Sequence, residues 1–156
     1  MKKTIRAKQN KMSVSFTPSS YDTDFYKWTR TQASLLKKGD FDQLDIKHLR
    51  EEIESMGNSE QSKLESYLIV LLLHLLKIKY QPTIKTRSWD LSVKHATHKA
   101  QKVLEKNPSL KHKLAETFEE AYYTAKYEAA KETGLDENIF PEVSEWKVSD
   151  LLKIKK

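Results

Sequence analysis

A long apolar segment near the middle of the chain limits the folds open to it more than any other feature. Between residues 59 and 79, leucine and isoleucine recur every three or four positions, which is the repeat of an α-helix. The main stripe consists of Leu64, Leu68, Leu71, Leu75 and Ile78, and it is widened past half of the circumference by Ile69, Leu72 and Leu76. A helix with so wide an apolar surface has to be covered on several sides. The sequence therefore predicts a helical bundle with this helix at its centre.

A membrane location is not expected for this segment. Its most apolar stretch, residues 67–76, contains His74 and is followed by Lys77. A membrane-spanning helix needs about 20 apolar residues, roughly twice the length of this stretch. The basic residues at the start of the chain are not followed by an apolar region, so no secretory signal peptide is expected. The chain also has no cysteine, which excludes disulfides and fits a reducing compartment, so we expect a cytoplasmic protein without membrane contact.

Helical periodicity covers most of the remaining chain, and only three glycines and four prolines interrupt it. Helix start and stop signals divide the chain into five expected helices. They cover residues 22–38, 45–56, 59–79, 88–106 and 108–133, followed by a short turn near residues 150–152. Gly39, Gly57 and Gly134 mark helix ends because glycine readily takes the left-handed conformation of a helix stop. The fold class is therefore all-α, an up-and-down bundle of about five helices within one domain of residues 21–156.

The second expected helix is short, and its apolar stripe is expected to face the core. The stripe consists of Ile46, Leu49, Ile53 and Met56. Gly57 ends this helix in the prediction, and the next helix begins at a capping box formed by Asn58 and Gln61. The prediction thus places a chain reversal between the second and third helices.

The positive charge of the chain is concentrated near its N-terminus. The formal net charge is +6, but residues 1–20 hold five cations and no acid. The other 136 residues hold 23 cations and 22 acids, which nearly cancel. Residues 1–20 lack apolar periodicity, so we expect a disordered basic tail. Met12 follows all five cations, and a chain that started there would lose the charge surplus.

Several short motifs, taken in order, are similar to those of a known family. Residues 49–57 read Leu-Arg-Glu-Glu-Ile-Glu-Ser-Met-Gly, residues 72–77 read Leu-Leu-His-Leu-Leu-Lys, and residues 80–82 read Tyr-Gln-Pro. They are followed by Arg-Ser-Trp at residues 87–89, Glu-Thr-Gly-Leu at 132–135, Phe-Pro at 140–141 and a tryptophan at 146. The chain resembles the bacterial domain-of-unknown-function family number 29 over residues 24–152. The resemblance implies a helical fold and a bacterial lineage, and it implies no reaction.

The chain departs from the family pattern at three positions. Family members usually have an aromatic residue where Ile78 stands, and often a Cys-Pro pair where Ser144 and Glu145 stand. The packing around the late tryptophan is therefore expected to differ from that of the family.

One candidate site combines Glu52, His48 and His74. Helical bundles carry out acid–base or metal chemistry with carboxylates and imidazoles that point inward from facing helices. Glu52 flanks the stripe of the second expected helix, His48 lies one turn before it, and His74 lies at the edge of the third helix's stripe. Glu52 and His74 can therefore meet across a helix seam, either as catalytic groups or as a structural pair that fixes helix register. We favour the structural interpretation.

No metal site or cofactor is expected. The Glu-x-x-His repeat of di-iron bundles does not occur in the sequence. His95 and His98 form a lone pair on an expected solvent face, which is too little for a metal site. The sequence also has no glycine-rich phosphate loop.

A second candidate site is a basic face on the fourth expected helix. Its residues are Arg87, His95, His98, Lys99, Lys102 and Lys106. A basic stripe opposite an apolar face is typical of helices that contact phosphates. The alternative is a solvated face, balanced by the acid-rich segments 40–65 and 114–150.

The leading hypothesis is a non-catalytic interaction module that binds another protein or itself. Three features support it. The predicted core is extensive, basic and acidic residues lie in different segments, and no group of catalytic side chains is expected to meet at one place. The first alternative is binding of nucleic acid or another polyanion through the basic face. The second alternative is a metal-dependent or acid–base enzyme that uses Glu52 and His74.

Overall fold

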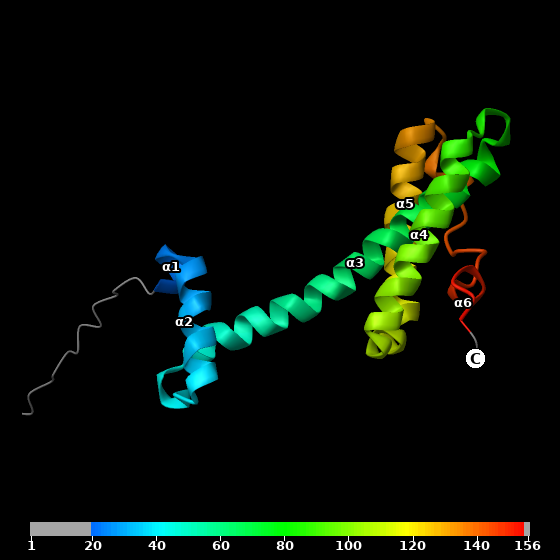
Figure 1. Cartoon of the computed structure of the whole chain (residues 1–156). Coiled ribbons are helices and arrows are strands. Elements are labelled where there is room, and N and C mark those ends of the chain that lie inside the picture. Colours follow the sequence, from blue (N-terminus) through cyan, green and yellow to red (C-terminus); the bar gives the residue numbers. More distant parts are fainter. Residues whose placement is uncertain (1–19, 155–156) are drawn as a thin grey trace, which may run out of the picture. The chain divides into compact units, whose positions relative to one another are not determined.

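The computed structural model describes residues 20–154, and all regular elements in that range are helices (Figure 1). The α-helices are α1 (Ser20–Thr23), α2 (Phe25–Lys38), α3 (Ile46–Tyr80), α4 (Arg87–Lys106), α5 (Leu114–Thr133) and α6 (Val148–Leu151). Short 3-10 turns are η1 (Phe41–Gln43), η2 (Pro82–Ile84), η3 (Pro108–Lys113) and η4 (Glu137–Ile139). The predicted all-α class is confirmed. The predicted basic tail lies outside the described residues, except for Ser20, which begins α1.

Two of the three predicted glycine stops are confirmed. Gly39 has a φ of 81° and its N–H donates to the carbonyl of Leu36, which ends α2. Gly134 has a φ of 70° and donates to the carbonyl of Ala130, which ends α5. Other residues would be strained at these angles, so glycine is required by the turn itself.

The third predicted stop, at Gly57, is wrong. α3 continues without a break through Gly57 for 35 residues, and the predicted capping box at Asn58 does not begin a helix. Glycine permits a left-handed stop but does not impose one, and it costs only about 1 kcal/mol inside a helix relative to alanine. The flanking glutamates, glutamine, leucines and methionine are good helix formers, which outweigh that cost. The predicted second and third helices are therefore one helix.

The contacts within the chain divide it into two compact units, Met1–Glu52 and Ile53–Lys156, which we describe separately. In the first unit, α1 and α2 lie beside the start of α3 (Figure 1). Its described residues include only two buried side chains, Trp28 and Gln32, which are 3% and 6% exposed. This unit thus has a very small interior. The single-domain organisation of residues 21–156 stays a prediction.

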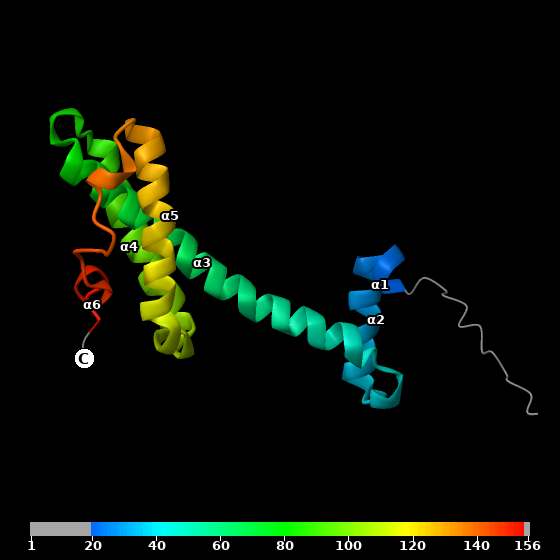
Figure 2. The ribbon, with the colours of Figure 1, turned by 180° about the vertical axis from the view of Figure 1, so that it is seen from behind.

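The second unit contains the main core. The later part of α3 lies side by side with α4 and α5 in both views (Figures 1 and 2). Its core residues are Leu64, Leu68, Leu71, Leu72, Leu73, Leu76, Ala96, Ala100, Val103, Leu104, Leu114, Phe118, Ala121, Tyr122, Ala125, Ala129, Phe140 and Leu152. The alanines of α4 and α5 are short enough for closely packed helix axes. The predicted central position of the leucine-rich segment is confirmed.

The exact face that α3 buries differs slightly from the prediction. Leu72 and Leu76, expected at the margin, are fully buried, whereas Leu75 and Ile78 of the predicted main stripe are only half-buried. The helix is apolar over so much of its surface that periodicity alone locates its buried centre only to within about one position.

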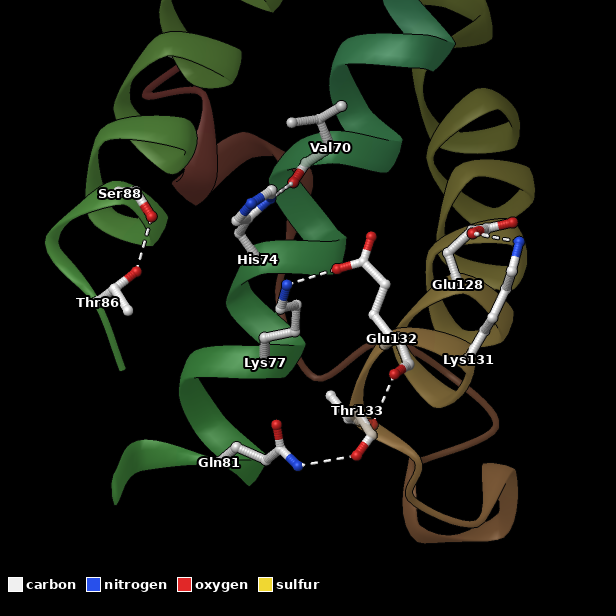
Figure 3. A network of polar contacts seen from close by, with 11 residues as sticks. Val70, His74, Lys77, Gln81, Thr86, Ser88, Glu128, Lys131, Glu132 and Thr133 are labelled. Atoms are coloured by element: carbon white, nitrogen blue, oxygen red, sulfur yellow. Dashed lines mark hydrogen bonds and ion pairs between the residues drawn. The ribbon is translucent and has the colours of Figure 1, made fainter. Parts of the chain in front are cut away.

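Polar contacts connect the ends of these helices. Lys77 of α3 donates to Glu132 of α5 at 2.5 Å, and the Gln81 amide donates to the carbonyl of Thr133 at 3.1 Å (Figure 3). Glu145 forms an ion pair with Lys79 of α3. This contact ties the C-terminal segment to α3. None of the helices in the described range has the length and apolarity to cross a membrane.

Candidate functional site

The structure does not bring Glu52 and His74 together. Both residues lie on the continuous helix α3, 22 positions or about six turns apart along its axis. The predicted pairing required a chain reversal at Gly57, and that reversal does not occur. The His74 ring instead bonds through Nδ1 to the carbonyl of Val70 on its own helix, at 2.8 Å (Figure 3). The predicted catalytic pair is therefore not formed.

Glu52 and His48 instead share a contact with Tyr21 in the first unit. The Tyr21 hydroxyl donates to Glu52 Oε1 at 2.6 Å. The Tyr21 ring stacks on the His48 imidazole, with ring centroids 4.0 Å apart and planes inclined by 14°. The one-turn spacing of His48 and Glu52 along α3 lets a single tyrosine contact both. Tyr21 thus joins α1 to the first two turns of α3.

Asp45 is the centre of the remaining polar contacts in this unit. Its Oδ2 accepts hydrogen bonds from Trp28 Nε1 at 3.1 Å and pairs with His48 Nδ1 at 2.7 Å. Its Oδ1 accepts from the backbone N–H of His48 at 3.3 Å, in the manner of a helix N-cap. Its own N–H donates to the Gln32 side chain at 2.9 Å. Asp45 therefore connects the interior face of α2 to the start of α3.

These contacts change the acidity of two groups. The hydrogen bond from His48 is the main cause that holds the pKa of Asp45 below its usual value, so this carboxylate stays charged. The hydrogen bond to Glu52, followed by desolvation, raises the pKa of Tyr21 to about 12. Tyr21 therefore remains a hydrogen-bond donor throughout the physiological pH range.

The arrangement favours a structural role for this cluster of Tyr21, Trp28, Asp45, His48 and Glu52. Each polar group is engaged with another member of the cluster or with the backbone at the start of α3. Among residues 20–154, no group of three or more histidine, aspartate or glutamate side chains is placed to hold a metal ion. Sequence reasoning missed Tyr21 and Asp45, although an aspartate three residues before His48 at an expected helix start is itself a capping signal.

The predicted basic face lies on α4 as expected. All six of its residues are exposed, opposite the buried side formed by Ala96, Ala100 and Leu104. Towards the C-terminus of α4, Lys102 pairs with Glu105 at 2.8 Å and Lys106 lies 3.8 Å from Glu60. The bond from Lys102 lowers the pKa of Glu105, so an acid moderates the positive charge at this end. The face is thus most purely basic around His95, His98 and Lys99.

A third surface lies on the first part of α3. Residues 46–63 of this helix include no buried side chain, and all seven residues from 53 to 59 are exposed. Ile46, Ile53 and Met56 are 64%, 67% and 70% exposed, while Leu49 is half-buried. These four residues, here called the α3 stripe, follow the a and d spacing of a coiled-coil seam. The sequence indicated their shared face but wrongly assigned it to the core.

Comparison with known proteins gives one match. A family model described as a domain of unknown function, DUF29, matches residues 20–155. This confirms the resemblance seen in the sequence motifs. No curated protein and no solved structure matches the chain.

Proposed function

Since the chain belongs to the DUF29 family, whose description names no activity, we propose a function from the geometry: it is a protein-interaction module that binds through the α3 stripe. The observation that carries this proposal is the exposure of Ile46, Ile53 and Met56 along one helix face. A contiguous exposed apolar surface on a folded domain is typical of a protein-binding site.

The energetics of a bare helix support the proposal. Most helical stability in proteins comes from packing of an apolar face and not from helix propensity. Residues 46–63 lack buried side chains, and Gly57 lowers their propensity further. Covering a large apolar side chain contributes about 1.5–3 kcal/mol relative to leaving it in water. A partner on the α3 stripe would therefore stabilise the part of α3 that the chain itself leaves uncovered.

Ile53→Glu tests the proposal in a pull-down with tagged full-length chain from the native lysate. Leu91→Glu is the matched control, because Leu91 is also an exposed apolar helix residue but lies on α4. We expect a partner that is retained by the parent and by Leu91→Glu and is lost with Ile53→Glu. Circular dichroism should show that all three proteins keep a helical fold. Recovery of the same proteins by all three would contradict a role for the stripe.

The exposed basic face of α4 supports a second candidate function, binding of nucleic acid. Phosphate contacts release counterions, so the affinity should fall steeply as salt rises, with a slope of about −0.9 per contact for duplex DNA. Fluorescence anisotropy with labelled DNA and RNA duplexes measures this slope. Changing Lys99, Lys102 and Lys106 together to Glu should abolish the binding, whereas Lys27→Glu, an exposed change on α2, should not. An absence of binding by the parent protein at low salt would rule this function out.

A further inference from the structure

We infer that the partner covering the α3 stripe is a second copy of this chain, packed through a two-fold symmetric interface. This inference rests on the proposed function and adds the identity of the partner. Three observations carry it: the self-matching pattern of the stripe, the distribution of charge between α2 and α3, and the small interior of the first unit.

The α3 stripe has the pattern of a two-stranded helix seam. Ile46 and Ile53 occupy a positions, and Leu49 and Met56 occupy d positions, of two consecutive heptads. Isoleucine at a with leucine-like residues at d suits the packing of two helices. In a two-fold interface the same surface is presented by both copies, so one stripe is sufficient to form both sides of the seam. The seven exposed residues 53–59 leave room around the helix for a second one.

Two heptads make a short seam, of which Ile46 and Leu49 lie in the first unit, and α2 adds further apolar residues to that unit. Phe25 and Leu36 lie three helical turns apart on one side of α2, and each is 49% exposed. Phe41, which follows in η1, is 63% exposed. The same unit therefore offers apolar side chains from two helices, as the subunits of a dimeric helical bundle do.

The charges of α2 and α3 are complementary within one chain. α2 contains four cations and no acid, namely Lys27, Arg30, Lys37 and Lys38. Residues 51–59 of α3 contain three acids and no cation, namely Glu51, Glu52 and Glu54, while Glu60 already pairs with Lys63 of its own chain. In a two-fold dimer each copy supplies both segments. The basic α2 of each copy can therefore face the acidic part of α3 in the other copy, which gives two such contacts. This match favours a second copy over an unrelated protein, for which no such complementarity is built in.

The described part of the first unit buries few of its side chains. Its described part, residues 20–52, comprises 33 residues with only Trp28 and Gln32 buried. Domains below about 40 residues usually depend on disulfides, metals or oligomerisation. The chain has no cysteine for a disulfide. Oligomerisation through the exposed apolar residues of this unit, Phe25, Leu36, Phe41 and Ile46, adds buried surface.

Sedimentation equilibrium of the purified full chain tests the inference. The parent and the Leu91→Glu control should sediment with about twice the chain mass of 18.3 kDa. Ile53→Glu should raise the dimer dissociation constant by about 100-fold or more, because symmetry places two unpaired carboxylates in an apolar seam. Ile53 is 67% exposed within the chain, so this change does not disturb the core. Hydrogen exchange provides a second measurement: amides of residues 53–59 should be more protected in the parent than in the variant.

The outcomes separate this inference from the proposed function. A parent that sediments at the mass of one chain at all concentrations would overturn the dimer. So would a dimer that Ile53→Glu leaves intact. If the purified parent is monomeric but retains a different protein from the lysate in an Ile53-dependent way, the dimer fails and the interaction module stands. If neither a dimer nor an Ile53-dependent partner is found, both fail.

Discussion

Leu72→Ala should lower the free energy of unfolding of the second unit by about 2–5 kcal/mol, the range for leucines removed from closed cores. Leu72 is fully buried on α3, in a core built with α4 and α5. The loss combines the transfer free energy of the missing methyl and methylene groups with the cavity left behind. Urea unfolding monitored by circular dichroism measures it, at one fixed protein concentration because self-association would add to stability.

Two further substitutions calibrate that result. Leu75→Ala should cost less than Leu72→Ala, because Leu75 is only half-buried. Leu91→Ala, on the surface of α4, should change stability by no more than about 0.5 kcal/mol. Equal small effects at Leu72 and Leu91 would show that the later part of α3 is not the centre of the bundle.

The sequence predicted those parts of the fold that depend on neighbouring residues, namely helix ends and buried helix faces. Gly39 and Gly134 end helices because the chain turns there through left-handed angles. The alternation of apolar residues after Leu64 predicted a buried central helix, because no other placement covers so wide an apolar surface. The exposed basic face of α4 also followed from periodicity, since Ala96 and Ala100 on the opposite side are buried.

The errors arose where a local signal had two physical outcomes. Gly57 can end a helix or lie within one, and the sequence alone does not show which outcome its surroundings favour. The stripe of Ile46, Ile53 and Met56 indicates a helix face that needs covering, but not which molecule covers it. The predicted pair of Glu52 and His74 required a helix end at Gly57 and a buried stripe on the second helix. Because α3 continues through Gly57, the pair does not form.

The cluster in the first unit depended on contacts distant in sequence. Tyr21 and Glu52 are 31 positions apart, and Trp28 and Asp45 are 17 apart. No periodicity connects such pairs, so only the three-dimensional structure identifies them. Asp45 alone carried a local signal, its position as the cap of α3.

Trp28→Ala should unfold the first unit while the second unit stays folded. Trp28 is the only buried apolar side chain among the described residues of the first unit. Its ring packs edge-on against Tyr21 with centroids 5.0 Å apart, and its Nε1 donates to Asp45. Removal of a buried tryptophan costs about 3–5 kcal/mol, and the Asp45 carboxylate loses a donor as well. A unit with so small an interior has little stability to lose.

Hydrogen exchange measured by peptide distinguishes this local unfolding from a global one. Peptides from α2 in Trp28→Ala should exchange at the rate of an unfolded chain, while peptides from α4 and α5 keep their protection. Tyr26→Ala is the matched control, since Tyr26 lies on the same helix and is 75% exposed. Trp28→Phe should fall between them, because it keeps an aromatic ring in the interior but removes the donor to Asp45. Unchanged protection of α2 in Trp28→Ala would show that contacts other than the interior of the first unit keep α2 folded. The proposed dimer interface would supply such contacts.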